Sequence, residues 1–167
     1  IMRAANEMGK RTVAVFADVQ NLYYTARQAH QRNVDYNALW ARATGGRQVV
    51  AAHAYAVERG DEKQRQFQNI LRAIGFNVKL KPFLQRADGS AKGDWDVGIT
   101  IDIMEQAPSV DRVVLASGDG DFAILADHIR ARHGCQVEVY GVAPLTAAAL
   151  MRAADDFIPI EGDLLLG

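Results

Sequence analysis

At 167 residues the chain has the size of one ordinary domain, and its 49% apolar and 23% charged residues are typical of a folded protein. The formal net charge of −1 provides no overall field that would attract nucleic acid, so any such binding requires a local patch. The single cysteine excludes a disulfide framework and a cysteine-based zinc site, and no apolar run reaches the roughly 20 residues that span a bilayer.

Apolar segments of strand length alternate with amphipathic segments along the chain. This alternation is typical of an α/β fold with a parallel sheet. The expected strands lie near residues 12–18, 48–57, 76–81, 112–117, 136–141 and 157–160. We expect one domain over residues 12–160 and interpret residues 1–11 as an N-terminal extension or a cloning remnant. No segment resembles a signal peptide, so a cytoplasmic location is expected.

The spacing of apolar residues predicts three helices. In the segment 60–74, a stripe at i, i+3, i+4 and i+7 should face the sheet, and Gly75 should end the helix; the stripe is Phe67, Ile70, Leu71 and Ile74. A helix after Asp121 shows the same stripe and ends at Gly134; its members are Phe122, Leu125, Ala126 and Ile129. The segment 95–106 has little polar surface, so we expect a helix that is buried on most sides. Residues 82–93 are expected to form a mobile loop.

Asp18 closes the first apolar run, in the motif Asp18-Val-Gln-Asn21. An aspartate at this position projects from the end of a strand. Asn21 falls in the first turn of the following helix, where its amide could orient a water molecule or a phosphate. Capping of that helix by one of the two residues is the alternative interpretation.

The motif Ser117-Gly-Asp-Gly-Asp121 follows the fourth expected strand. Its two glycines allow a sharp turn, and Asp121 fits the N-cap of the helix that starts at Phe122. Capping does not explain Asp119, which lies in the turn with no apparent need for its charge. The motif lacks the signatures of a P-loop and of a dinucleotide fold, which argues against a nucleotide cofactor.

A third acidic group opens the predicted helix 95–106, in the motif Lys92-Gly-Asp-Trp-Asp96. Carboxylates are favoured in a first helical turn by the helix dipole, which is the simpler interpretation. However, Asp96 begins a nearly apolar helix and must point out of its N-terminal end. Asp102 lies six residues further, roughly 240° around the helix, so we interpret it as a supporting or structural carboxylate.

The acidic residues of these three motifs lie where strands end or helices begin. In a parallel sheet, the carboxyl ends of strands meet at one edge, where ligands bind. Carboxylates that converge there repel one another unless a cation holds them, and oxygen ligands suit Mg²⁺ or Mn²⁺. No Ser–His–Asp or Cys–His triad is indicated. The sequence therefore predicts a divalent-metal site of the kind that supports metal-assisted hydrolysis.

Together, these motifs resemble the NYN-domain family, the LabA-like branch of the PIN-like ribonuclease superfamily. The resemblance covers roughly residues 12–160 and is carried by Val15-Phe-Ala-Asp-Val-Gln-Asn-Leu22, Lys92-Gly-Asp-Trp-Asp-Val97 and Val114-Leu-Ala-Ser-Gly-Asp-Gly-Asp-Phe122. It implies a PIN-like Rossmannoid fold of three layers, α/β/α, around a mostly parallel sheet of five to six strands. It also implies a nuclease that depends on Mg²⁺ or Mn²⁺ and acts on RNA.

The resemblance also implies roles for individual residues. The catalytic and metal-binding acids would be Asp18, Asp96, Asp119 and Asp121, and Asn21 and Ser117 would support them as substrate-binding residues. Family members often have Lys-Gly followed by one residue and then aspartate, whereas two residues intervene here, so Asp94 is an alternative ligand. We favour Asp96, because the apolar pattern of the predicted helix begins at this residue.

RNA would need cations close to these acids, because carboxylates repel its phosphates. Arg86 and Lys92 are the candidate phosphate-binding residues, with Lys79 and Lys81 nearby, and solvated surface is the alternative interpretation. Three aromatic residues could stack on the bases of single-stranded RNA: Tyr23, Tyr24 and Trp95. For Trp95, packing under the helix is the alternative.

The sequence therefore predicts a metal-dependent endoribonuclease that hydrolyses single-stranded RNA through an aspartate cluster. A non-catalytic RNA- or protein-binding module with the same fold is one alternative, and another metal-dependent phosphoesterase is a second. No membrane partner is expected, and the sequence leaves a homo-oligomer open.

Overall fold

A six-stranded sheet forms the centre of the computed structural model, which describes residues 11–82, 84, 85, 91, 92 and 94–167. All of its neighbouring strands pair in parallel, in the order β3-β2-β1-β6-β7-β8. The strands are β1 (Arg11–Asp18), β2 (Arg47–Glu58), β3 (Asn77–Pro82), β6 (Arg112–Ala116), β7 (Gln136–Gly141) and β8 (Asp156–Pro159). Each predicted strand is present within one residue of its expected bounds, which confirms the parallel α/β fold.

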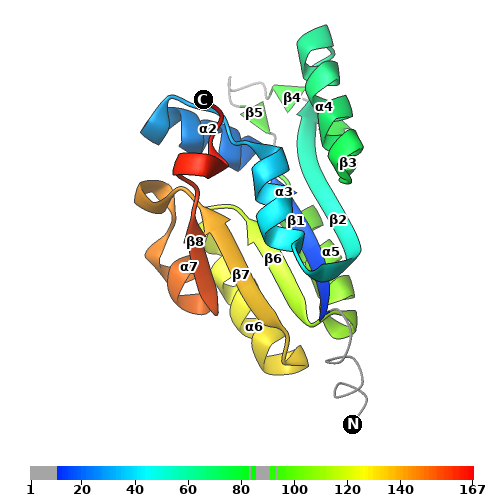
Figure 1. The fold of residues 1–167 in the computed structure, drawn as a ribbon, viewed down its shortest axis with the longest axis vertical. Coiled ribbons are helices and arrows are strands. Elements are labelled where there is room, and N and C mark those ends of the chain that lie inside the picture. Colours follow the sequence, from blue (N-terminus) through cyan, green and yellow to red (C-terminus); the bar gives the residue numbers. More distant parts are fainter. Residues whose placement is uncertain (1–10, 83, 86–90, 93) are drawn as a thin grey trace.

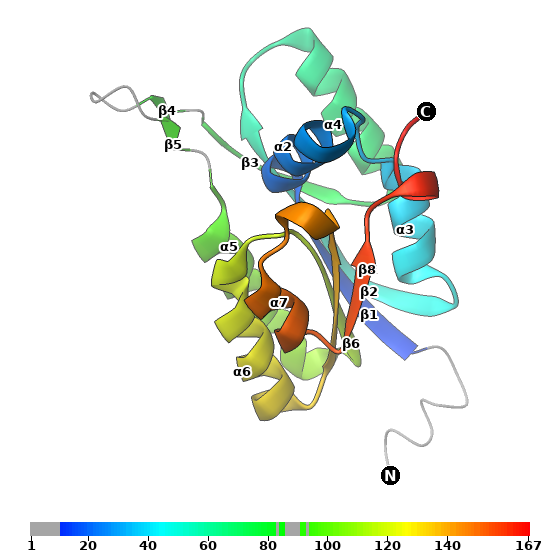
Figure 2. The ribbon, with the colours of Figure 1, turned by 90° about the vertical axis from the view of Figure 1, so that its left-hand side faces the viewer.

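Helices cover both faces of this sheet, so the fold has three layers (Figures 1 and 2). One face carries α2 (Val19–His30), α3 (Tyr36–Thr44) and α4 (Glu62–Ile74). The other carries α5 (Asp96–Gln106), α6 (Ala123–His133) and α7 (Ala148–Ala153). Short 3₁₀ turns complete the chain: η1 (Ala107–Ser109), η2 (Gly120–Phe122), η3 (Ala143–Leu145) and η4 (Gly162–Leu164).

Strand β1 lies in the middle of the core. Side chains alternate along a strand, and those of β1 supply both faces. Val13, Val15 and Ala17 pack with the α2, α3 and α4 layer, whereas Ala14 and Phe16 pack with the α5, α6 and α7 layer. A strand buried on both faces must be apolar throughout, which explains why residues 13–17 form an unbroken apolar run.

The direction in which strands are added reverses between β1 and β6. From β1 the chain proceeds outward through β2 and β3, then crosses back and proceeds outward through β6, β7 and β8. The carboxyl ends of β1 and β6 are therefore neighbours at a topological switch point, where parallel α/β sheets bind their ligands. Asp18 ends β1, and the Ser117–Asp121 turn directly follows β6.

Some details of the predicted helices are confirmed and others are wrong. Gly75 and Gly134 end α4 and α6 with positive φ angles of 139° and 65°, as predicted. Ile70, however, is 53% exposed, so the α4 stripe that faces the sheet lacks it. The prediction that α5 is buried on most sides is also wrong. Only Ile99 and Ile103 are buried on it, because α5 lies in an outer layer; the exposed apolar residues are Val97, Ile101 and Met104.

The stretch predicted as a mobile loop, residues 82–93, lies partly outside the described residues. Within it, β4 (Leu84–Gln85) and β5 (Ala91–Lys92) form a short antiparallel pair. Figure 2 shows this pair at a distance from the main sheet, beyond the start of α5. The sequence did not predict either strand.

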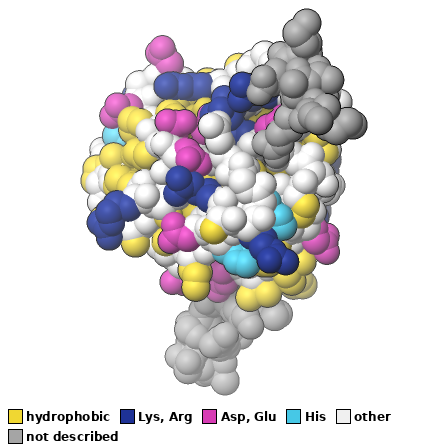
Figure 3. Space-filling model, turned by 90° about the horizontal axis from the view of Figure 1, so that it is seen from below, with side chains coloured by type: hydrophobic (Ala, Val, Ile, Leu, Met, Phe, Trp, Pro, Cys, Tyr) yellow, Lys and Arg dark blue, Asp and Glu magenta, His cyan; other side chains and the backbone are white. Residues whose placement is uncertain are grey.

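Charges are mixed on the face that Figure 3 shows. In Figure 3, acidic and basic side chains are interspersed, and neither sign forms a continuous field. This pattern agrees with the net charge of −1. Within the described part of the chain, no helix has the length and apolar character that crossing a membrane requires. The cytoplasmic location stays a prediction.

Candidate metal centre

Asp18 is held at the switch point by two hydrogen bonds. Its Oδ1 accepts a long hydrogen bond, 3.5 Å, from the backbone N–H of Asn21, and its Oδ2 accepts one from the Ser117 hydroxyl at 3.0 Å. The Asn21 side chain in turn accepts from the backbone N–H of Gly118 at 2.9 Å. The β1–α2 and β6–α6 turns are therefore joined side by side. Asn21 and Ser117 position this junction, and direct contact of either with a substrate stays a prediction.

Asp119 caps the turn that leads into α6. Its Oδ1 accepts from the backbone N–H of Asp121 at 2.9 Å, while its own N–H donates to the Ser117 hydroxyl at 3.2 Å. The prediction that Asp121 is the N-cap is wrong, because η2 precedes α6 and moves the cap back by two residues. The capping role of Asp119 was not expected. The cap uses one carboxylate oxygen, and the carboxyl group also interacts with the Asp96 side chain.

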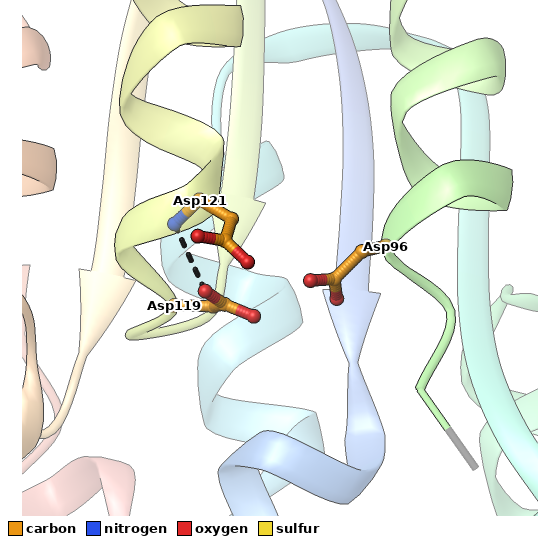
Figure 4. A group of neighbouring side chains, drawn as sticks. All are labelled: Asp96, Asp119 and Asp121. Carbon is orange, nitrogen blue, oxygen red and sulfur yellow. Dashed lines mark hydrogen bonds between the residues drawn. The ribbon is translucent and has the colours of Figure 1, made fainter. Parts of the chain in front are cut away.

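Three carboxylates from two separate elements converge here, as Figure 4 shows. Asp119 and Asp121 come from the η2 turn, and Asp96 points towards them from the first residue of α5. One oxygen of each lies within 4.8 Å of one oxygen of each of the others. We call Asp96, Asp119 and Asp121 the acid centre.

The two remaining predicted acids lie beside the acid centre and not within it. Asp18 is buried, with 5% exposure, and its charge acts on both Asp119 and Asp96. Asp94 is exposed, and its Oδ1 accepts from the backbone N–H of Asp96 at 3.3 Å. The structure thus brings Asp96, and not Asp94, together with the η2 carboxylates.

The electrostatics of the junction favour protons or cations. Burial, followed by the neighbouring Asp119, raises the pKa of Asp96 to about 7. Burial likewise raises the pKa of Asp18 to about 6, although hydrogen bonds from Ser117 and Asn21 oppose the rise. Carboxylates with pKa values this high bind a positive charge more readily than ordinary surface acids do.

A buried acid at the opposite edge of the sheet provides a contrast. Glu138 forms ion pairs with Arg47, at 2.9 Å, and with Arg112, and these partners lower its pKa. Among the residues that the structure describes, no Lys, Arg or His forms an ion pair with Asp18 or with the acid centre. The protein therefore compensates one buried acid internally and leaves a cluster of acids uncompensated. Such an all-oxygen donor set fits Mg²⁺ or Mn²⁺.

Tyr55, which the sequence interpretation missed, and Lys79, which it placed near the RNA, fix the helix that carries Asp96. The Tyr55 hydroxyl donates to Asp102 at 2.8 Å, and Lys79 forms an ion pair with the same carboxylate at 2.6 Å. These contacts join α5 to β2 and β3, so Asp102 is a structural residue, as predicted. Tyr55 and Lys79 lie opposite each other on the paired strands β2 and β3, and this register was the signal that could have identified them as partners of one carboxylate.

Most of the predicted RNA-binding side chains near α5 have structural partners or are not described. Trp95 is packed, because its indole N–H donates to the Ala56 carbonyl at 2.8 Å and its ring lies 5.4 Å from that of Tyr55. Lys81 donates to the Asp94 carbonyl at 2.7 Å. Arg86 lies outside the described residues, and the side chain of Lys92 is not described either. Tyr23 and Tyr24 are about half exposed, as base stacking would require.

The glycines of the Ser117–Asp121 turn are needed for space. Neither has a positive φ angle, so the turn does not depend on the left-handed conformation that glycine allows. A Cβ atom at Gly118 would lie 2.8 Å from the Leu145 carbonyl, and one at Gly120 would lie 2.7 Å from the Cβ of Ala147. The segment between β7 and α7 thus packs directly against the turn and holds Asp119 and Asp121 in place.

We therefore expect Gly120→Ala to destabilise the protein by about 1–3 kcal/mol, the usual cost of overpacking, and to shift the acid centre. Ala147→Gly removes the atom that the new methyl group would meet. The double variant should recover most of the lost stability in chemical denaturation. Additive losses in the two variants would show that this contact does not hold the turn.

A three-layer fold with carboxylates clustered at its switch point is consistent with a PIN-like domain, as the sequence motifs implied. The chain belongs to the NYN domain family, whose model matches residues 12–161. This family lies within the PIN-like nuclease superfamily, whose domains use divalent metals.

Two relatives are similar over most of the chain. The protein called "Low amplitude and bright protein LabA" from Synechococcus elongatus is 26% identical over 160 residues, which covers 89% of this chain and 83% of LabA. A crystal structure of a protein of unknown function from Vibrio parahaemolyticus is 55% identical, with a TM-score of 0.90. That match covers 94% of this chain and 97% of the Vibrio chain.

Proposed function

We propose that this protein is an endoribonuclease that uses Mg²⁺ or Mn²⁺ to hydrolyse phosphodiester bonds in single-stranded RNA. The observation that carries the proposal is the acid centre, where three carboxylates from two elements converge with no cation paired to them among the described residues. A module that only binds RNA gains nothing from such repulsion next to a polyanion.

Asp96, Asp119 and Asp121 would hold the metal. Asp18, buried beside them at the end of β1, would add its negative charge. When bound, the metal would lower the pKa of a water molecule and stabilise charge on the phosphate oxygens. The chain's own contribution is to fix the donors. Asp119 is held by the Asp121 N–H, and Asp96 is held by the contacts of Asp102 with β2 and β3.

Helix α2 would supply contacts to the substrate. Tyr23 and Tyr24 are exposed on α2, and their rings lie 5.5 Å apart in an edge-on arrangement. They lie on the helix that begins directly after Asp18, so they could stack on unpaired bases of a strand that reaches the acid centre. Arg86 and Lys92 stay predicted phosphate-binding residues.

A labelled circular single-stranded RNA tests the proposal. An endonuclease opens a circle, whereas an exonuclease cannot start on one. We expect linear products with Mn²⁺ or Mg²⁺ and none with EDTA. Retention of the RNA without cleavage would favour the binding module. Hydrolysis of a small phosphate ester without cleavage of RNA would favour another phosphoesterase.

A further inference from the structure

A hollow lies on the α2 and α4 side of the sheet, at its carboxyl edge. Its volume is about 490 Å³. Helices α2 and α4 form its walls, Ala56 and Val57 at the end of β2 form its floor, and the segment around Val34 and Leu166 closes one side. The volume is within the range of small-molecule sites.

Two buried amide groups in this hollow lack hydrogen-bond partners. The Oε1 of Gln20 and the Nε2 of Gln68 are fully shielded, and neither has a partner among the residues that the structure describes. Gln68 is only 2% exposed, and both residues line the hollow. Buried polar atoms are almost always paired in native proteins. Because both residues line the hollow, rotation of either side chain would present its unpaired atom to a ligand there that offers the complementary group. We call this hollow the amide pocket.

Aromatic rings and cations surround these amides. Tyr36 and Phe67 pack together with ring centroids 5.7 Å apart, and Tyr23 and Tyr24 also line the pocket. Arg59 and the exposed Lys63 lie at its rim, and Arg59 approaches the Tyr24 hydroxyl at 3.4 Å. One acid, Asp61, also lines the pocket, but its Oδ1 caps α4 by accepting from Gln64 N–H at 2.7 Å.

The amide pocket adjoins the acid centre. Val19 and Gln20, which line the pocket, directly follow Asp18 in the chain. The Asp18 charge also reaches Tyr36, since it adds to the effect of burial in raising the pKa of that phenol. A ligand in the pocket and a ligand at the acid centre would thus lie on either side of the end of β1.

We propose that the amide pocket binds a nucleotide, with its base against the aromatic rings and hydrogen-bonded to Gln20 and Gln68, and its phosphate towards Arg59 and Lys63. Planar bases combine stacking faces with edges that carry both donors and acceptors, which matches this lining. Assigning the nucleotide to the RNA substrate rests on the proposed function, whereas nucleotide binding itself does not.

Calorimetric titration of the whole protein tests the proposal. The probes are the four nucleoside 5′-monophosphates, ribose 5-phosphate as a ligand without a base, and a short RNA oligonucleotide. We expect at least one nucleotide to bind and ribose 5-phosphate not to bind. Tighter binding of the oligonucleotide than of any mononucleotide would assign the pocket to the RNA substrate. Equal affinities would assign it to a free nucleotide.

Gln68→Leu removes the buried amide and keeps a similar volume. It should weaken nucleotide binding by about 3- to 10-fold, the usual effect of one hydrogen bond. Its melting temperature should be equal or higher, because an unpaired polar group has been replaced by an apolar one. Gln28→Leu, on the exposed part of α2, is the matched control and should bind as the wild type does.

Wild-type protein that binds no nucleotide at millimolar concentration, or a Gln68→Leu variant with unchanged affinity, would overturn the proposal. Its failure is distinct from failure of the nuclease assignment. RNA cleavage without nucleotide binding contradicts only the amide pocket. Nucleotide binding without RNA cleavage contradicts only the proposed catalytic activity.

Discussion

Replacing Asp119 by Asn should reduce metal-dependent RNA cleavage by at least about 100-fold while leaving the protein folded. Asparagine is as good an N-cap as aspartate, and its side-chain oxygen can still accept from the Asp121 N–H. The substitution therefore removes the charge and preserves the turn. The charge is what would hold the metal. Loss of a metal ligand should therefore reduce activity by more than the roughly 10- to 100-fold that is typical when a residue behind a ligand is changed. Cleavage rates at saturating Mn²⁺ measure the effect.

The control for this variant is Asp127→Asn, which removes one aspartate charge from an exposed position on α6. It should cleave RNA at the wild-type rate. If Asp119→Asn and Asp127→Asn lose activity equally, the effect comes from net charge and the acid centre is not the active site. If Asp119→Asn retains full activity with an unchanged melting temperature, the carboxylate serves only as a cap.

The stability of the metal-free protein should fall as the pH rises from about 4 to about 7. The pKa of Asp96 is raised to about 7 and that of Asp18 to about 6, from an ordinary 3.8. Between these limits the folded protein binds more protons than the unfolded chain does, so each pH step upward favours unfolding. The contribution of the two protons is fully present below pH 4 and is lost above about pH 7. The other charges that act on Asp96 are Asp119 and Asp94.

A divalent metal should reverse this trend, because it competes with protons for the same oxygens. At 100 times its dissociation constant, a ligand stabilises by about 2.7 kcal/mol, and each kcal/mol raises the melting temperature of a domain this size by about 2–4 °C. We therefore expect Mn²⁺ to raise it by about 5–10 °C at pH 7.5 and by much less at pH 5. Thermal scans over pH 5–7.5 avoid the acid range where Asp102 and Glu138, whose pKa values are lowered, become protonated. Burial also lowers the pKa of His53, which gives the opposite trend in this window, so the trend is measured as the difference from Asp96→Asn.

Asp96→Asn is the matched variant for this measurement. It should flatten the pH dependence of the metal-free protein and reduce the response to Mn²⁺. A wild-type melting temperature that is independent of Mn²⁺ at pH 7.5 would argue against a metal centre at this place.

The strands were predictable because parallel strands leave a strong local signal. Strands buried on both faces require continuous apolar runs, as in residues 13–17 and 113–116, and glycines with positive φ mark the helix ends at Gly75 and Gly134. The convergence of Asp96 with Asp119 and Asp121 was also predictable, because strand ends and helix starts share one edge of a parallel sheet.

Features that depend on contacts between distant segments were not predictable from local patterns. The exposed side of α5 carries the apolar residues Val97, Ile101 and Met104, so apolar spacing alone does not separate it from the buried side with Ile99 and Ile103. The close approach of Ala147 to Gly120 depends on packing between segments 27 residues apart. The amide pocket likewise needs α2 and α4 to meet before Gln20 and Gln68 become buried.

Asp18 and Gln20 are separated by a single residue, yet one belongs beside the acid centre and the other lines the amide pocket. The same short piece of backbone therefore sets the distance between the two places. If an RNA strand occupies both, the cleaved bond lies a constant number of nucleotides from the base that is bound in the pocket. An RNA that carries a single preferred base should then be cut at one fixed distance from that base, and Gln68→Leu should weaken this preference without stopping cleavage.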